Sequence, residues 1–376
     1  MSMWLYRTLS ECCNLITDGT HYTPPPVAEG VPFLTVKDLT VSGLDLAGSS
    51  KIARDEYERA VAGNSAPKLG DVLFSKDGTV GKVHVVSDAE EFAVLSSIAI
   101  LRPNPSIVES AFLGYMLRYP GVLHDALNKK TGSAIRRLVL RDLKTLRIPV
   151  PPIPEQHRIV DLLSRAEGIV RLRREAEKKA TELIHALFLD MFGDPATNPK
   201  GWQTQPFGQL VENKDGKRRP IKSADRANRQ GPYPYYGASG IIDTFDDYLF
   251  EGEHLLIAED GANLISRSTP ITFLATGKYW VNNHAHVVAA NGKANLTFLE
   301  CQLNLRDMTD SITGSAQPKL NQANLNCIPI LTPPISAQIR FAEHIEQVRS
   351  IESQQAAATD KSQATFDALL ASTFSK

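Results

Sequence analysis

Two long stretches of this chain carry nearly the same sequence, and this internal repeat constrains the fold more than any other feature. Residues 132–160 read GSAIRRLVLRDLKTLRIPVPPIPEQHRIV, and residues 314–342 read GSAQPKLNQANLNCIPILTPPISAQIRFA. At a constant offset of 182 residues, 17 of the 62 positions from Gly132 to Gly193 are identical, where chance would give about four. The chain is therefore a duplication, and not two unrelated segments that share a proline-rich turn.

The repeat continues upstream with weaker similarity. Trp4 and Trp202 begin comparable segments, and GDVLFSKDG at 70–78 resembles GEHLLIAEDG at 252–261 once one inserted residue is allowed. Each unit therefore consists of a variable block followed by a well-matched tail. The two blocks share a plan but little sequence.

Composition predicts an ordinary cytoplasmic protein with two cores. The chain has 376 residues, of which 42% are hydrophobic and 22% charged, and no apolar run approaches the roughly 18 residues of a membrane span. The first residues show no signal-peptide pattern. Four cysteines without a CxxC spacing provide neither a disulfide framework nor a zinc site. A net charge of −1 argues against a binder of nucleic acid that is basic throughout.

Both tails are predicted to be long helices. After the Pro-Pro-Ile stop, the segment 154–190 carries two apolar columns at heptad spacing, which makes a rod of roughly 55 Å. The columns of the first tail are Ile159, Ala166, Arg173, Ala180 and Leu187, and Leu162, Ile169, Ala176 and Leu183. Those of the second tail are Phe341, Val348, Gln355, Ser362 and Leu369, and His344, Ile351, Ala358 and Thr365. We expect the two helices to pack on each other rather than to be solvated linkers, with a weaker second seam because its middle is polar.

The variable blocks are predicted to be mostly strand. DVLFS, KVHVV, FAVLSSIAIL and RIPVPPI in the first block, and HLLIA, ITFLA and HVVAA in the second, are short β-branched runs between Gly, Asp and Pro. Short helices are expected at SAFLGYMLRYPGVLHDALNK and NLTFLECQLN, ahead of each Gly-Ser-Ala. The fold class is therefore α+β: two globules of mixed strand and helix, separated by two long helices.

Catalytic and metal-binding motifs are missing from the sequence. It contains no GxGxxG after a strand, no GxxxxGK[ST] and no HExxH. His284 and His286 could form a metal pair, but no carboxylate or cysteine stands at ligand spacing, so a strand or turn role is favoured. Asp77, Glu259 and Asp260 lie in a turn-like context. We expect no catalysis, no metal and no cofactor in this chain.

Each unit nevertheless has a concentrated basic segment that suits contact with phosphate. In the first unit the cations are Lys129, Lys130, Arg136, Arg137, Arg141, Lys144 and Arg147. In the second they are Lys214, Lys217, Arg218, Arg219, Lys222, Arg226 and Arg229. Aromatic and amide side chains lie nearby in GPYPYYGASG at 231–240 and VNNHAH at 281–286, and amide side chains can pair with bases. The alternative for either run is a solvated face.

With these features the chain resembles the specificity subunit of type I restriction-modification enzymes. The resemblance is carried by two variable blocks, each followed by Gly-Ser-Ala, Pro-Pro-Ile-x-x-Gln-x-Arg and a long helix, and by FGDPATNPKGW at 192–202. It covers nearly the whole chain. The tail motifs are fairly specific to the family, whereas the variable blocks are not.

The resemblance implies a non-catalytic subunit that reads a bipartite site on double-stranded DNA. Residues 1–152 and 202–334 would be target recognition domains, 153–193 and 335–376 spacer helices packed as an antiparallel coiled coil, and 194–201 a linker. Two methyltransferase subunits, which bind S-adenosylmethionine, would dock on the repeated tails, and restriction and translocase subunits could join them. The repeat would then let two copies of one partner bind equivalently.

The second tail departs from the first in charge. Pro318, Ala323 and Asn326 replace three cations, Arg136, Arg141 and Lys144. We therefore do not expect equal affinity of the partners for the two tails.

Candidate DNA contacts follow from the basic and amide-rich segments, and phosphate contacts should outnumber base contacts. In the first unit they are His21, Tyr22, Lys37, Lys76, Thr79, Ser97, Arg136 and Arg137. In the second they are Tyr235, Tyr236, Ser239, Asn263, Arg267, Asn283, His284 and Lys319. Two other functional classes stay open: an adaptor whose globules grip protein, and an enzyme with an unrecognised site. A steep salt dependence of binding would favour DNA over protein.

Overall fold

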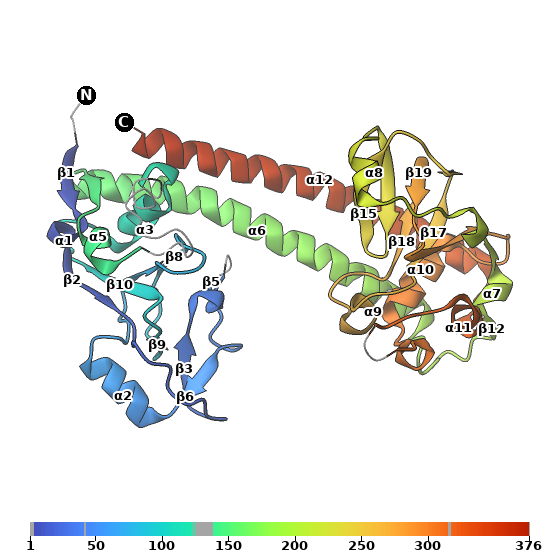
Figure 1. Ribbon diagram of the computed structural model, residues 1–376, viewed down its shortest axis with the longest axis horizontal. Helices are drawn as coiled ribbons and strands as arrows, with labels where there is room; N and C mark the ends of the chain where they lie inside the picture. The colour runs from blue at the N-terminus through green and yellow to red at the C-terminus, as the bar shows by residue number, and fades with distance from the viewer. Residues whose placement is uncertain (1–3, 41–42, 123, 125–137, 315–316, 376) are drawn as a thin grey trace. The chain divides into compact units, whose positions relative to one another are not determined.

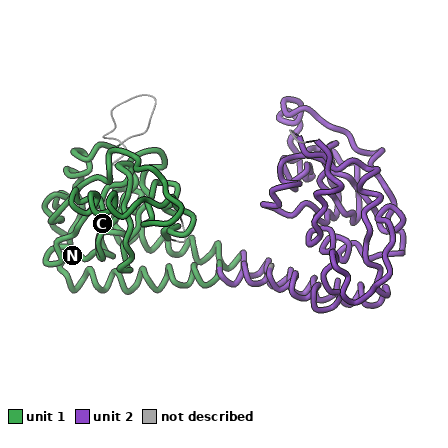
Figure 2. The backbone as a smooth tube through the Cα atoms, turned by 90° about the horizontal axis from the view of Figure 1, so that it is seen from below, with its two compact units in different colours: residues 1–174, 357–376 green, residues 175–356 purple. Residues whose placement is uncertain are grey.

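The computed structural model describes residues 4–40, 43–122, 124, 138–314 and 317–375, and the chain divides into two compact units (Figure 2). Unit 1 comprises residues 1–174 and 357–376, and unit 2 comprises residues 175–356. The two long helices, α6 (Ile153–Phe192) and α12 (Ile335–Phe374), cross the boundary, so each unit contains part of both (Figure 1).

Unit 1 combines short strands with four short helices in the described residues. The strands are β1 (Leu5–Thr8), β2 (Cys13–Asp18), β3 (Val31–Leu34), β4 (Leu39–Thr40), β5 (Gly43–Leu44), β6 (Ser50–Ile52), β7 (Val72–Ser75), β8 (Val83–Val85), β9 (Ala93–Val94), β10 (Ile98–Pro103) and β11 (Arg147–Val150). The helices are α1 (Leu9–Cys12), α2 (Arg54–Ala62), α3 (Ser110–Arg118) and α5 (Leu140–Lys144), with a 3-10 turn, η1 (Val36–Asp38). Of these, α1 is a single turn that a capping box between Thr8 and Glu11 holds in place.

Unit 2 has a similar succession of elements. Its strands are β12 (Thr204–Pro206), β13 (Val211–Asn213), β14 (Tyr233–Gly237), β15 (Gly240–Phe245), β16 (Phe250–Glu251), β17 (His254–Ala258), β18 (Thr272–Ala275), β19 (Lys278–Val281), β20 (Ala285–Ala290) and β21 (Pro329–Leu331). Its short helices are α7 (Phe207–Leu210), α8 (Ser223–Ala227), α9 (Asn263–Ser266), α10 (Leu296–Leu305) and α11 (Gln322–Cys327), with 3-10 turns η2 (Asp215–Lys217) and η3 (Thr309–Ser311).

The sheets show that the duplication includes the variable blocks. The order β2-β10-β7-β8 in unit 1 corresponds to β13-β20-β17-β18 in unit 2, and the pair β1-β11 corresponds to β12-β21. A second sheet contains one parallel pair in each unit, β3 with β9 and β14 with β19. Because β1 and β12 pair with the strand just before a long helix, each block closes on the start of its own tail.

Most of the expected strands and helices are present, with differences at their ends. FAVLSSIAIL forms two strands, β9 and β10, because a turn interrupts it at 95–97. The helix expected from Ser110 ends at Arg118, since Tyr119 is extended before Pro120, as residues that precede proline usually are. Residues 125–137 lie outside the described part of the chain.

The long helices take part in the core of each unit. In unit 1, Ile159, Leu163 and Val170 of α6 share a buried cluster with Phe366 and Phe374 of α12. The Arg174 guanidinium also donates to Gln363 Oε1 at 3.0 Å. Each block is therefore built onto both helices, and burial of these faces stabilises it through the hydrophobic effect.

In unit 2 the corresponding contacts are aromatic. Phe188 and Phe192 of α6 surround Phe341 of α12 and Phe298 of α10, with ring centroids 4.9–6.4 Å apart. All four rings are buried. Such a cluster of edge-to-face and stacked rings fixes the helix ends onto the block.

Of the two apolar columns predicted to be buried on each long helix, one was right and the other was wrong. Ile159 is buried as expected, but Leu162, Ile169 and Leu183 are 41–53% exposed. The buried partners lie one residue later, at Leu163 and Val170. The second tail shows the same shift, because Ile345 and Phe366 are buried whereas the predicted His344 and Thr365 are exposed.

The sequence could not locate this column because apolar residues are adjacent at these positions. Leu162–Leu163 and Ile169–Val170 satisfy heptad spacing equally well in either register. Only the packing of each block against its helix selects one of the two registers. None of the helices in the described ranges has the length and apolar character needed to cross a membrane.

Candidate nucleic-acid interface

The basic run of unit 2 is largely neutralised by carboxylates. Four of its cations form ion pairs: Lys214 with Glu212, Arg218 with Asp215 and Glu259, Arg226 with Asp243, and Arg229 with Asp246. Lys217, Arg219 and Lys222 are exposed and have no ion pair among the residues that the structure describes. This run therefore offers three free cations to a phosphate backbone and not seven.

Only part of the basic run of unit 1 lies within the residues that the structure describes. Its first four cations, Lys129, Lys130, Arg136 and Arg137, lie outside the described residues. Arg141 is exposed and lies 3.5 Å from Asp142, a distance at which an exposed pair contributes little. Arg147 is also exposed. The described end of the run thus presents positive charge to solvent.

Three of the predicted contacts in unit 1 are open to solvent: His21, Lys37 and Thr79. Tyr22 is exposed too, but its hydroxyl donates to Glu56. Lys76 is only 1% exposed, and its ammonium lies 3.3 Å from Asp18 Oδ1. Lys76 is therefore a buried partner of Asp18 and cannot reach DNA in this conformation, because an ammonium group is buried only where a counter-charge compensates it.

Ser97 is close to this buried pair. Its backbone carbonyl accepts a hydrogen bond from the Lys76 amide at 2.9 Å, and its own hydroxyl is buried without a hydrogen bond among the described residues. Ser97 therefore belongs to the interior of the turn around Lys76 and is a weak candidate for contact with DNA.

Two predicted contacts of unit 2 have different environments although they are adjacent. Tyr235 is fully buried beside Phe245, and its hydroxyl accepts a hydrogen bond from the Ile221 amide at 2.9 Å, so it is a core residue and not a DNA contact. Tyr236 is half-buried, stacks on Phe273, and has a raised pKa because of burial. Alternation along β14 places the two side chains on opposite faces.

Asn263 and Arg267 support the loop after β17. Asn263 Oδ1 accepts from the Thr269 amide at 3.0 Å, and Arg267, in a left-handed conformation, donates to the Arg306 carbonyl at 2.9 Å at the end of α10. Burial lowers the pKa of the Arg267 guanidinium. These polar side chains are occupied within the fold, so their role is to position the loop.

A buried charge network lies beneath this surface. Each nitrogen of the His286 ring lies within hydrogen-bond distance of an oxygen, Nδ1 of Asp215 Oδ2 at 2.6 Å and Nε2 of the Leu320 carbonyl at 2.8 Å. Burial alone would raise the pKa of Asp215, but the hydrogen bonds from His286 and the Val287 amide outweigh it and lower the pKa.

Glu259 extends the network to the predicted contact Lys319. The Glu259 carboxylate accepts from Arg218 at 2.6 Å and lies 3.1 Å from the Lys319 ammonium. Burial would raise the Glu259 pKa, but the Arg218 hydrogen bond and the neighbouring charges lower it. Lys319 remains half exposed and can still face a phosphate. Glu259 is therefore more than a turn residue, because it links η2 to the segment before α11.

Several predicted contacts of unit 2 meet at one cavity of about 330 Å³. Ser239, Asn263 and His284 line it, whereas Asn283 is exposed and does not. Sequence reasoning missed Asn282 and Ile242, which also line it. Their signal was the amide pair in VNNHAH and the apolar pair at 241–242, but neither pattern shows which member of the pair faces inward.

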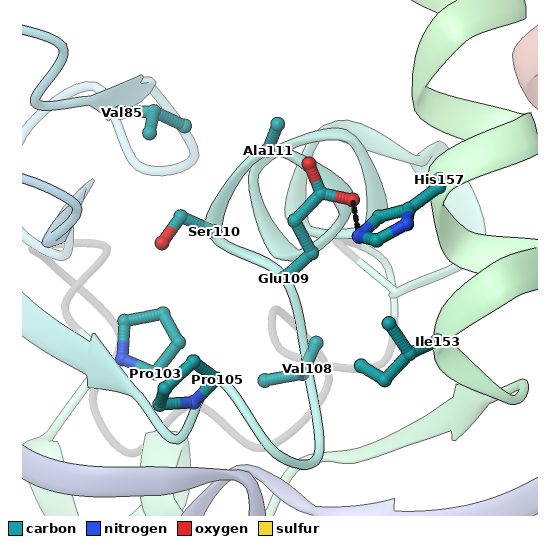
Figure 3. Close-up of a pocket in the computed structure, with 9 residues that line it drawn as sticks. All are labelled: Val85, Pro103, Pro105, Val108, Glu109, Ser110, Ala111, Ile153 and His157. Atoms are coloured by element: carbon teal, nitrogen blue, oxygen red, sulfur yellow. Dashed lines mark ion pairs between the residues drawn. The ribbon is translucent and has the colours of Figure 1, made fainter.

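Unit 1 has a different recess, of about 350 Å³, at the start of α6 (Figure 3). Its walls are mainly apolar, from Val85, Pro103, Pro105, Val108, Ala111 and Ile153. Glu109 and His157 form an ion pair at 3.7 Å on one side. Because Ile153 and His157 belong to the tail and the other lining residues to the variable block, this recess lies where the block meets its tail.

The described side chains form no cluster of metal ligands, and burial suppresses the reactivity of two of the thiols, Cys12 and Cys301. Within the described ranges, no group of three or more His, Cys, Asp or Glu side chains is placed to hold a metal ion. Burial raises the pKa of the Cys301 thiol to about 12 and that of Cys12 to about 11. Such thiols stay protonated at neutral pH and are poor nucleophiles.

The family follows from comparison with known proteins. Residues 1–182 and 199–358 match the family described as type I restriction modification DNA specificity domain. The chain belongs to this family. As a specificity subunit, it has two such domains, in agreement with the repeated topology of the two units.

Relatives of the specificity subunit are distant. A Haemophilus influenzae protein that bears the name of a type I restriction enzyme specificity subunit is 36% identical over 151 residues, which span 40% of this chain but only 38% of the relative. The MjaX specificity subunit of Methanocaldococcus jannaschii is 20% identical over 92% of this chain and 86% of its own length. The S subunit of M. genitalium has a similar fold, with a TM-score of 0.59 at 17% identity, covering 98% of this chain and 95% of that one.

Proposed function

We propose that each unit of this specificity subunit reads one half of a split site on double-stranded DNA. The observation that carries the proposal is that two blocks of equal topology, with different loops, are each attached to a matching tail. The reading blocks are residues 1–152 and 202–334. Equal scaffolds with unlike loops suit the recognition of two unlike sequences, because loops held by a rigid scaffold carry specificity.

The two long helices would form an antiparallel coiled coil that sets the distance between the half-sites, with 194–201 as a linker. Two contacts support this arrangement. In unit 1 the start of α6 packs with the end of α12, and in unit 2 the end of α6 packs with the start of α12. Both buried columns also keep a seven-residue repeat.

Two methyltransferase subunits would dock on the tails, and restriction and translocase subunits would join them. Apolar side chains support such docking: the recess beside Ile153 in unit 1, and Ile335 and Ile339 in unit 2, each 45% exposed. Ile335 corresponds to Ile153 at the repeat offset, and Ile339 to His157. The ring of His157 in place of isoleucine makes the two docking surfaces unequal.

Chemistry would reside in the partners and not in this chain. The partner methyltransferase subunits would bind S-adenosylmethionine, and the specificity subunit would contribute affinity and orientation. The absence of nucleotide-binding and nucleophile motifs from the sequence supports this division of labour.

The test is a chimera whose block from Trp202 to about Ile312 comes from another specificity subunit. Mapping methylated bases in cells should show one half-site changed and the other retained. If both halves change together, the blocks do not read independently. Purified complexes should also lose DNA affinity steeply as salt rises. A shallow salt response would favour the protein-binding adaptor.

A further inference from the structure

We infer that the cavity of unit 2 receives the major-groove edge of a thymine in the half-site read by that unit. The inference rests on the DNA-reading role proposed above and names the base and the groups that recognise it. Two side chains carry it: Ile242 supplies an apolar contact and Asn282 supplies a hydrogen-bond donor.

Ile242 faces the cavity because a β-bulge interrupts the hairpin. Tyr235 pairs with Asp243 and Tyr236 with Ile241, so Ile242 is the extra residue without a partner across the ladder. Its side chain lines the cavity and stays 53% exposed. A bulge redirects a side chain away from the regular alternation, and here it leaves the Ile242 methyl groups at the cavity, accessible to a ligand.

Asn282 supplies a donor that opens onto the cavity and has no protein acceptor among the described residues. The residue is 5% exposed, its backbone amide donates to Tyr236, and its Oδ1 accepts from the His284 amide at 2.8 Å. Its Nδ2 has no acceptor among the described residues. This nitrogen is not among the buried side-chain atoms that lack a partner, so it faces the open space of the cavity and can donate to a ligand that enters.

The absence of a side chain at Gly237 brings these two groups together. A Cβ built on Gly237 would lie 3.0 Å from Ile242 Cδ1 and 3.5 Å from Asn282 Nδ2, so both border the same small space. The other polar side chains of the wall are occupied: Asn263 holds its own turn, and Asp260 binds His284 Nδ1 at 2.8 Å. Apart from Asn282, the Ser239 hydroxyl, the second His284 nitrogen and the remaining acceptor positions of the Asp260 carboxylate are left in the wall.

A donor next to methyl groups matches one base. In the major groove thymine presents the O4 acceptor and the C5 methyl, whereas cytosine presents an N4 donor that would oppose Asn282 Nδ2. Guanine and adenine have acceptors there but no methyl group for Ile242. Thymine is therefore the base whose edge satisfies both side chains.

Two cations lie next to this cavity. Exposed Arg219 is hydrogen-bonded through its backbone to Val281 and Trp280, immediately before Asn282. The backbone of half-exposed Lys319 forms a β-bridge with that of Asp260, and its ammonium group pairs with Glu259 at 3.1 Å. Cations at the margin of an amide-lined cavity are the arrangement expected where phosphates flank a base that is read.

The experiment uses the full specificity subunit assembled with its partner methyltransferase subunits, after its methylated motif has been mapped in cells. Duplexes of that motif carry deoxyuridine in place of one thymine at a time, which removes only the C5 methyl. At one thymine the wild-type complex should lose about four-fold in affinity, the value for one buried methyl group. Ile242→Ala should bind the thymine and uracil duplexes equally, whereas Ile241→Ala, on the neighbouring exposed residue, should respond as the wild type does.

Two outcomes would overturn the inference. The first is that Ile242→Ala does not differ from wild type at any thymine, and the second is that the half-site of unit 2 contains no A·T pair. If the wild-type complex methylates no bipartite motif at all, the proposed DNA-reading function fails as well. This result distinguishes failure of the proposed function from failure of the thymine inference alone.

Asn282→Asp and Gly237→Ala provide an independent measurement. Asn282→Asp keeps the acceptor for the His284 amide and exchanges the free donor for an acceptor, so the preference at that base pair should move from thymine towards cytosine. Gly237→Ala should crowd Ile242 Cδ1 and Asn282 Nδ2 and abolish discrimination at the same pair while salt-dependent, non-specific binding persists. Unchanged discrimination in both variants would place the thymine contact elsewhere.

Discussion

Gln156 and Gln338 hold the same position in the two repeats, and each donates from Nε2 to the proline carbonyl five residues earlier at 2.8 Å. Both side chains are buried. Each Oε1 also accepts from the backbone amide of a helix N-cap residue in its own block, Glu109 before α3 in unit 1 and Asn295 before α10 in unit 2. One glutamine therefore joins a block to its tail in each unit.

The first prediction concerns these glutamines. Gln156→Ala should destabilise unit 1, and Gln338→Ala unit 2, by about 1–3 kcal/mol each, because each change leaves buried backbone groups without partners. Hydrogen exchange resolved by peptide should show the loss confined to the unit that carries the change. Gln354→Ala, on an exposed position of α12, is the matched control and should have little effect.

The second prediction tests which column of α6 is buried. Leu163→Ala should lower the free energy of unfolding by about 2–5 kcal/mol, as for other buried leucines. Leu162→Ala, at the adjacent residue, should cost much less because that side chain is 41% exposed. Urea denaturation of the two variants measures the difference. Equal losses would contradict the observed seam.

A third prediction concerns acid. The pKa of Asp215 is lowered in the folded state, so its charge stabilises unit 2 above its unfolded pKa of about 4 and this stability disappears as the pH falls below that value. Asp215→Asn should therefore be less stable than wild type at pH 7 and lose less stability between pH 5 and pH 3. Thermal unfolding across that range is the measurement, with exposed Asp225→Asn as the control. Parallel pH curves for wild type and Asp215→Asn would contradict the assignment.

The fourth prediction concerns the proposed spacer. Seven residues inserted into both helices, between Arg174 and Glu175 and between Ala356 and Ala357, should preserve the buried columns and add about 10 Å. At 3.4 Å per base pair, the gap between half-sites should grow by about three base pairs. Methylation mapping in cells reads the gap directly. Active protein with an unchanged gap would exclude the helices as the element that sets the spacing.

Much of the architecture could be read from the residues alone. The repeat, the α+β class and the two long helices follow from sequence identity, strand-like runs and heptad spacing, all of which are local or periodic signals. The family resemblance followed from the tail motifs, and the family match agrees with it.

Side-chain environments required the tertiary structure. The sequence presents Arg218 as one of seven clustered cations, but in the fold it pairs with Glu259, which is 41 residues away. In the same way Lys76 is buried against Asp18. Ile242 became a candidate only because a bulge redirects it towards Asn282. Whether a polar or apolar side chain is free depends on residues distant in the chain, and no local pattern records which of them the fold brings into contact.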